Sequence, residues 1–275
     1  AGLLLVVLGI LGFLVYRALF VLPERRPTFH FASRYVVYDT QQGTQYAMES
    51  TRELSRFFAE IPEQPDDPFI RAAYDDSEEI KAPDALKNPP PIEFLENDVF
   101  FYYLNCQLIL GPPEESAADV QGGGESGEQA PDQGEKDPEP ENEIRILSPM
   151  RNRESVSLKN FLHKLNRYQA KTKILFLDAG NHAWSPAFGD RQSVDRDTLR
   201  TWLEQQEFRN LAVIFSHQNH ESSLPLHSRK RSLFSLAIEN AFVQLSESDR
   251  DSFDAESLHD LIETGCWTLA RSVGR

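Results

Sequence analysis

Three almost continuously apolar segments constrain the fold of this chain more than any other feature. They are residues 98–110 (DVFFYYLNCQLIL), 173–178 (KILFLD) and 211–215 (LAVIF). A strand that is apolar all round needs cover on both of its faces, and parallel sheets in α/β proteins provide that cover. Amphipathic segments alternate with these strands, so we expect an α/β fold with a mostly parallel sheet and helices on both faces.

The remaining elements follow from periodicity and from turn residues. Aromatic and β-branched residues 29–39 predict a first strand, closed by a turn at residues 41–43. In the proline-rich and acid-rich stretch that follows, residues 69–74 are the best strand candidate. Apolar residues at helical spacing predict helices over 46–61, 158–165 with Ser157 as N-cap, 198–206, 233–245 and 255–264.

The first 22 residues are apolar except for Arg17, and as a helix they would span roughly 30 Å, the thickness of a bilayer core. We therefore expect residues 1–22 to form a transmembrane helix. A buried core helix and the apolar region of a signal peptide are the alternatives, but this run is too long for a signal peptide and no cleavage site follows it. Arg17, Arg25 and Arg26 at its carboxyl end predict a single-pass membrane protein with its folded domain in the cytoplasm.

An acidic insert interrupts the predicted domain. Residues 111–143 contain eleven acids and one base, so this stretch supplies −10 of the formal charge of −15. Its proline, glycine and glutamate content is typical of a disordered loop, with an acidic docking element as the alternative. The expected organisation is a transmembrane helix at 1–22, a first domain part at 23–110, the disordered insert at 111–143 and a second domain part at 144–275.

Composition excludes several classes of function. The charge of −15 and a pI near 4.9 argue against a nucleic-acid partner, because neutralising phosphates needs a basic face. Two cysteines, Cys106 and Cys266, are too few for a disulfide framework and favour a reducing compartment. The triple glycine at 122–124 has no strand before it, so no phosphate-binding loop, and hence no cofactor, is expected.

Working residues in open α/β sheets stand at the carboxyl ends of the strands. In this chain those ends are residues 104–107, 178–182 and 216–221. They are therefore the places where we look for chemistry.

Six strings in chain order resemble segments of one known family. Two carry most of the resemblance: DVFFYYLNCQ resembles the strand of caspase-like peptidases that ends in Ser-Gly-His-Gly, and KILFLDAGNHA resembles their Asp-x-Cys-x-Ser-Gly strand. The resemblance covers roughly residues 29–264 outside the insert, and it implies a caspase-like three-layer sandwich. The other strings are AVIFSHQNHESS, RILSPMRNRESVSLKNFLHKL, RSLFSLAIENAF and DRDSFDAESLHDLI.

The same resemblance argues against catalysis. A Cys/His peptidase needs a thiolate nucleophile and an imidazole that accepts its proton and returns it. Gln107 stands where the family has its His, and Gly180 stands where it has its Cys. The acid that precedes the family's nucleophile is retained as Asp178. The resemblance therefore implies a catalytically inactive relative, with no catalytic residue at Gln107 or Gly180.

Residues near these strand ends also suggest three other chemistries. Cys106 and His182 flank the vacated positions and could form an inverted pair, although alternation along the strand should point Cys106 away from the face that Gln107 uses. His182, His217 and His220 could ligate a metal, but no Cys or Asp completes a recognised spacing, so no metal is expected. Ser216 with His217 or His220 as a base lacks a nucleophile-elbow motif.

We therefore expect a membrane-anchored pseudopeptidase that binds or scaffolds a protein or peptide partner. The alternative is an active cysteine-type peptidase or hydrolase that uses Cys106 and His182, and a third possibility is an unrelated α/β nucleotide or metal module. The expected binding groove consists of Asp178, Asn181, Ser216, His217, His220 and Glu221.

Overall fold

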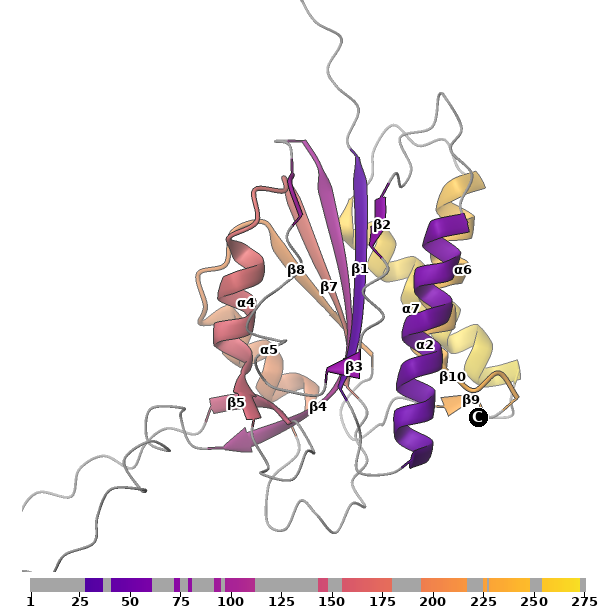
Figure 1. Cartoon of the computed structure of the whole chain (residues 1–275), viewed down its shortest axis with the longest axis horizontal. Helices are drawn as coiled ribbons and strands as arrows, with labels where there is room; N and C mark the ends of the chain where they lie inside the picture. Colours follow the sequence, from indigo (N-terminus) through magenta and orange to yellow (C-terminus); the bar gives the residue numbers. More distant parts are fainter. Residues whose placement is uncertain are drawn as a thin grey trace, which may run out of the picture.

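The computed structural model describes twelve stretches of the chain, which together form an α/β fold with a mixed sheet and helices on both of its faces (Figure 1). The expected α/β class is therefore confirmed. The described residues are 28–36, 41–60, 72–74, 79–80, 92–94, 97–111, 143–147, 155–179, 194–216, 225–226, 228–247 and 254–272.

Parallel strands form the centre of the sheet. β1 (Phe29–Val36) pairs with β4 (Val99–Gly111), β4 pairs with β7 (Thr172–Ala179), and β7 pairs with β8 (Leu211–Phe215), all in parallel. The two short strands β2 (Ala72–Tyr74) and β3 (Glu79–Ile80) pair in parallel with β1. The three apolar segments of the sequence are thus β4, β7 and β8, side by side.

The sheet is mixed because β4 extends beyond the ends of its parallel neighbours. β4 has 13 residues, whereas β7 has eight and ends opposite Cys106. From Gln107 onward β4 pairs antiparallel with β5 (Glu143–Leu147), which pairs antiparallel with β6 (Ser155–Ser157). The expectation of a mostly parallel sheet was therefore wrong: the chain returns at the same end of β4, and such a return pairs antiparallel.

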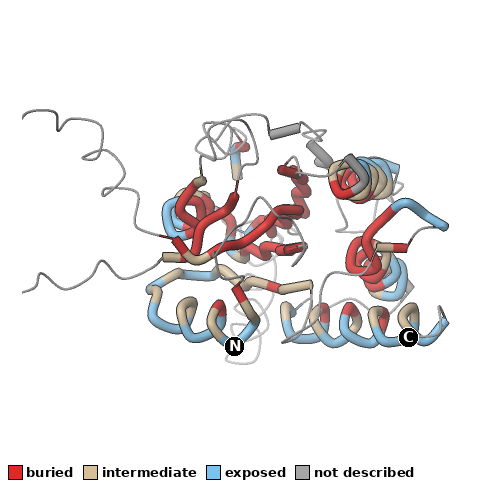
Figure 2. Tube along the Cα trace, turned by 90° about the horizontal axis from the view of Figure 1, so that it is seen from below, coloured by how far each residue is buried: buried red, intermediate tan, exposed pale blue. Residues whose placement is uncertain are grey.

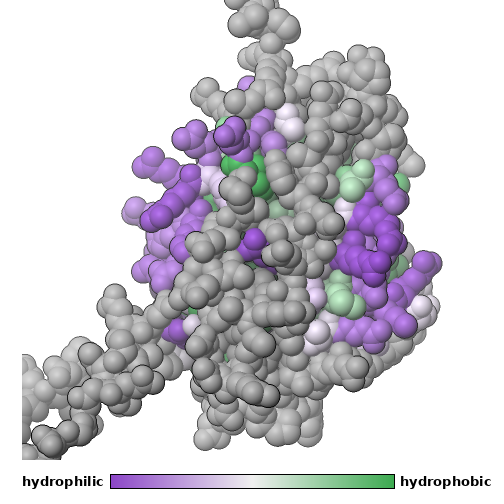
Figure 3. Space-filling model, in the orientation of Figure 1, coloured by the Kyte–Doolittle hydropathy of each residue, from purple (hydrophilic) through white to green (hydrophobic). Residues whose placement is uncertain are grey.

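Helices cover the two faces of the sheet. α2 (Gln41–Glu60), α6 (Leu233–Glu247) and α7 (Ala255–Ser272) lie on one face, while α4 (Leu158–Asn166) and α5 (Arg196–Glu204) lie on the other (Figure 1). Figure 2 shows the buried strands enclosed by helices whose outer sides are exposed. The described surface on the face seen in Figure 3 is mainly hydrophilic. A hairpin of β9 (Pro225–Leu226) and β10 (Arg231–Ser232) precedes α6.

Alternation along β4 separates two hydrophobic cores. Phe100, Tyr102 and Leu104 belong to the core beneath α4 and α5, whereas Phe101 and Tyr103 belong to the core beneath α2, α6 and α7. Side chains of consecutive strand residues point to opposite faces, so a strand buried on both sides is apolar at most positions. This explains why the sequence of β4 reads as an unbroken apolar run.

Helix ends match the sequence in part. The side chain of Ser157 accepts a hydrogen bond from the backbone N–H of Asn160 at 3.4 Å, so the predicted N-cap of α4 is confirmed. α2 already begins at Gln41, so the turn predicted at 41–43 was wrong. α7 continues to Ser272, eight residues beyond its predicted end.

No helix within the described residues is long and apolar enough to cross a membrane. The predicted transmembrane segment at 1–22 lies outside the described residues, as do residues 112–142 of the acidic insert.

Candidate functional site

The candidate site lies at the carboxyl end of β7 and at the adjacent middle of β4, where the parallel pairing of the two strands ends. Asn105 of β4 is the register partner of Asp178 of β7. Tyr103 and Asn105 are two residues apart in one strand, so their side chains share a face, which is the face covered by α2, α6 and α7. Parallel pairing therefore brings three polar side chains together under the helices.

These three side chains form a buried hydrogen-bonded cluster. The Tyr103 hydroxyl donates to Oδ2 of Asp178 at 2.6 Å, and Nδ2 of Asn105 donates to the same oxygen at 3.0 Å. Nδ2 of Asn105 also lies 3.2 Å from the Tyr103 hydroxyl oxygen. Tyr103 and Asp178 are fully buried, and Asn105 is 6% exposed. A buried carboxylate needs such donors, and here the protein itself supplies them.

The phenol of Tyr103 stays protonated in this environment. Its burial and the neighbouring charge of Asp178 raise its pKa well above the ordinary value, and hydrogen bonds from Asn105 and Ser232 oppose the shift only in part. Ser232 links the cluster to the helical layer, because its backbone N–H donates to Oγ of Ser50 at 2.8 Å and its own Oγ accepts from the N–H of Ser235. The cluster is thus anchored to both α2 and α6.

Gln107 lies at the point where β4 leaves the parallel sheet. It is the first residue of β4 to pair with β5, opposite Leu147, and it is 5% exposed. Its side-chain oxygen Oε1 is buried and has no hydrogen-bond partner among the described residues. A carboxamide cannot take up or release a proton near neutral pH, so Gln107 can accept or donate hydrogen bonds but cannot serve as a general base.

Cys106 has neither the direction nor the ionisation of a nucleophile. Its side chain is fully buried in the core beneath α4 and α5, on the face of β4 opposite to Asn105. Burial, and to a lesser degree the charge of Asp178, raise the pKa of its thiol. Because the thiolate is the reactive form of cysteine, a buried thiol of raised pKa is inert.

Cys266 lies on α7, in the helical layer that covers the face of the cluster. Partial burial, the charge of Asp178 and that of Glu263 raise the pKa of this thiol to about 12. The side chain is half-buried and is packed against the core beneath α2, α6 and α7.

Of the other residues expected at the strand ends, the structure describes one. Ser216 follows β8, is half-buried, and its backbone N–H donates to the carbonyl of Leu177 at 3.1 Å. The others lie outside the described residues: Gly180, Asn181, His182, His217, His220 and Glu221.

Sequence reasoning missed Tyr103, Asn105 and Ser232. A usable signal was present, because Tyr103, Asn105 and Gln107 alternate along a strand that is otherwise largely apolar. Polar groups in a buried strand must find partners, and strand alternation puts these three on one face. Asp178, at the end of the next buried strand, is an acid that can pair with them.

A groove of about 490 Å³ lies near the opposite ends of the strands. The rings of Phe94 and Tyr168, with centroids 5.0 Å apart, form part of it. The ring of Phe94 also contacts that of the buried His30, whose Nε2 lies 2.9 Å from Oδ2 of Asp98. These are the amino ends of β1 and β4, where α/β folds seldom place their chemistry. The groove is lined by Ile92, Glu93, Phe94, Arg167, Tyr168 and Gln169.

No protein-family model matches the chain. No curated protein matches it either. The geometry described above therefore carries the functional argument.

Proposed function

We propose that this chain is a membrane-anchored, catalytically inactive caspase-like domain that binds a protein or peptide partner. The pairing of strands supports this proposal. A caspase-like sheet needs the two dyad-bearing strands side by side and in parallel, and β4 and β7, which carry Gln107 and Asp178, pair in parallel from Val99 to Cys106 of β4. Helices on both faces of the sheet agree with a three-layer sandwich.

The observation that carries the inactive assignment is the side-chain chemistry at these two strand ends. Gln107 offers an amide where an imidazole would be needed, and its oxygen is buried without a partner. The nearest described thiol in β4, Cys106, faces the opposite core. Without a thiolate and a titrating base on one face, covalent peptide hydrolysis has neither its nucleophile nor its proton carrier.

Asp178 has a structural role in this proposal. Tyr103 and Asn105 already donate to its Oδ2, so the cluster fixes the ends of β4 and β7 relative to each other. Recognition then belongs to Gln107 and to the strand-end segments that carry Asn181, Ser216, His217, His220 and Glu221. The segment 1–22 would tether this module to a membrane, with the domain on the cytoplasmic side.

A peptide-display library tests the binding role separately from hydrolysis. The wild-type chain should retain specific peptides and cleave none of them. Gln107→Leu should weaken retention, and circular dichroism establishes that the variant keeps its fold, because the substitution removes the amide nitrogen together with Oε1. The matched control is Gln169→Leu, at the opposite end of the sheet. Cleavage that disappears in Cys106→Ala or His182→Ala would overturn the inactive assignment.

Restoring the dyad tests the caspase-like resemblance itself. The double variant Gln107→His with Gly180→Cys should gain labelling by a thiol-directed peptidase probe, whereas each single variant should not, because nucleophile and base are both required. A folded double variant that stays unlabelled would argue against equating these strand ends with those of the family. For the anchor, removal of residues 1–22 should release the chain from membranes into the soluble fraction.

A further inference from the structure

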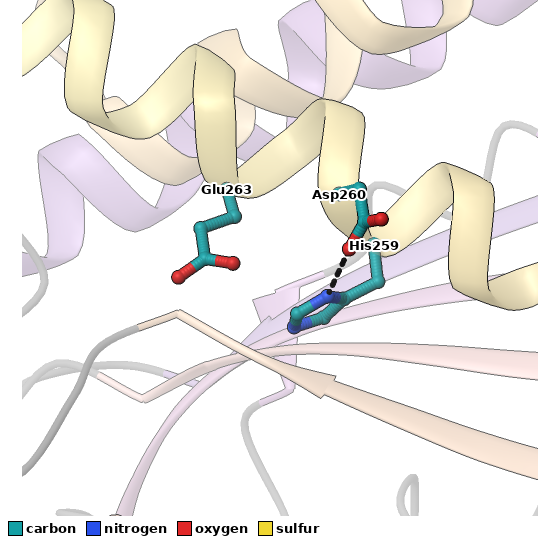
Figure 4. A group of neighbouring side chains, drawn as sticks. All are labelled: His259, Asp260 and Glu263. Atoms are coloured by element: carbon teal, nitrogen blue, oxygen red, sulfur yellow. Dashed lines mark hydrogen bonds and ion pairs between the residues drawn. The ribbon is translucent and has the colours of Figure 1, made fainter.

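We propose that His259, Asp260 and Glu263 on α7 form a binding site for one divalent transition-metal ion, with Zn²⁺ as the reference ion. Figure 4 shows His259 and Glu263 on the same side of the helix, with Asp260 beside the imidazole. The site is separate from the strand ends, and its existence does not depend on the proposed pseudopeptidase function.

Helical spacing brings the three ligands together. Residues three and four positions apart are neighbours on a helix surface, which places Glu263 next to both Asp260 and His259. One ligand atom from each side chain lies within 4.8 Å of the others. Ligand atoms around one Zn²⁺ ion lie about 3.3 Å apart, since each metal bond is about 2.0–2.2 Å long. Side chains at an exposed position can make that movement of roughly an ångström by adjusting their rotamers.

The carboxylates are not neutralised by basic groups. Asp260 lies 3.4 Å from Nδ1 of His259, and within the described residues neither Asp260 nor Glu263 forms an ion pair with a lysine or an arginine. The negative charge of Glu263 also reaches Cys266, where it adds to the effects of burial and of Asp178 in raising the pKa of the thiol. Among the described residues, the imidazole of His259 is thus the only basic group paired with either carboxylate, so a bound cation would add favourable counter-charge on this side of α7.

The donor set selects the class of metal. One imidazole nitrogen and two carboxylates suit Zn²⁺ and its first-row neighbours, whereas Mg²⁺ and Ca²⁺ prefer sites made of oxygen alone. Three protein ligands leave at least one coordination position open, to be filled by water or by a donor from a bound partner. The side chains are accessible to an ion from solution, since those of His259 and Asp260 are 44% and 73% exposed.

Zinc titration of the untagged full-length chain in detergent tests the proposal. Isothermal titration calorimetry should show one Zn²⁺ ion bound per chain at this site, and His259→Ala and Glu263→Gln should each weaken it at least tenfold. His163→Ala is the matched control, because it removes an exposed imidazole from α4, on the other face of the sheet. The His163→Ala variant should bind Zn²⁺ with the affinity of the wild type.

A second readout locates the ion. Trp267 lies one helical turn beyond Glu263 and is 52% exposed, so Cu²⁺ bound at the site should quench its fluorescence. Quenching should vanish in His259→Ala and persist in Cys266→Ser. Two results would overturn the proposal: Zn²⁺ binding that survives His259→Ala, or binding that is lost in Cys266→Ser, which would transfer the ion to the thiol. Circular dichroism of each variant establishes that α7 remains helical.

Discussion

Replacing Tyr103 by phenylalanine removes one oxygen atom from the buried cluster at the strand ends. That oxygen donates to Asp178 at 2.6 Å and also bonds with Asn105, and none of these groups can turn to water instead. A hydrogen bond to a charged group contributes about 1.5–3 kcal/mol, and Asp178 would retain only the donor from Asn105. We therefore expect the free energy of unfolding to fall by about 2–3 kcal/mol, which lowers Tm by roughly 4–12 °C.

Urea denaturation of the full-length chain in detergent measures this change as a lower midpoint with an unchanged slope. The control is Tyr102→Phe, which removes the same atom from the adjacent buried tyrosine, in the opposite core. It should cost clearly less. Combining Tyr103→Phe with Asp178→Asn should reveal a coupling of at least about 1 kcal/mol. If Tyr103→Phe stays within about 0.5 kcal/mol of the wild type, the phenol does not hold the carboxylate and the reasoning fails.

Three further predictions concern packing, pH and chain length. Gly265→Val should destabilise the packing of α6 against α7 by about 1–3 kcal/mol in thermal melts, because even one added Cβ would lie 3.3 Å from Cβ of Ala237. The second substitution Ala237→Gly should restore part of this stability, and a double variant that is no more stable than Gly265→Val would contradict the reasoning. Burial raises the pKa of Cys266 to about 12 in the folded chain, from about 8.5 in the unfolded chain, so the protonated thiol contributes its full share of folding stability below pH 8.5. That share is lost as pH rises toward the folded pKa, by at most about 1.4 kcal/mol per pH unit. The urea midpoint should therefore fall less steeply with pH in Cys266→Ser than in the wild type, and an equal fall in both would show that this thiol is not responsible. Replacing residues 112–142 by a four-residue turn should stabilise the fold by about 1–2 kcal/mol, because β4 and β5 pair up to the residues flanking this segment; a chain that no longer unfolds cooperatively would show that the segment is needed for folding.

The central strands could be predicted from the sequence because burial on both faces leaves an unmistakable apolar run. Residues 211–215 form β8 with the expected bounds, and β4 and β7 differ from expectation by one residue at each end. Helices with one apolar stripe, such as α4, were equally clear, and Ser157 fixed the start of α4. In these elements the local pattern and the tertiary environment agree.

The antiparallel extension could not be predicted, because β5 and β6 are short and carry Arg145, Ser155 and Ser157 among their apolar residues. These polar groups are satisfied by one another: Nε of Arg145 donates to Oγ of Ser155 at 2.7 Å, and Oγ of Ser157 donates to Glu143 at 3.1 Å. Such pairing depends on which strand edge is available, and only the fold decides that. The buried cluster was missed for a similar reason, because it requires knowing that β4 and β7 are neighbours.

The strand β4, which contributes side chains to both cores, limits how this site can change in evolution. Gln107 and Cys106 are consecutive residues that face opposite cores, so a shift of β4 by one residue would exchange an amide for a thiol at the strand end. Pairing with β1 and β7 on its two sides, and with β5 beyond them, fixes the present alignment. Point substitutions at this strand end are therefore open to drift and selection. A single-residue insertion or deletion within β4 would instead point each following side chain of the strand into the opposite core, and selection would remove it.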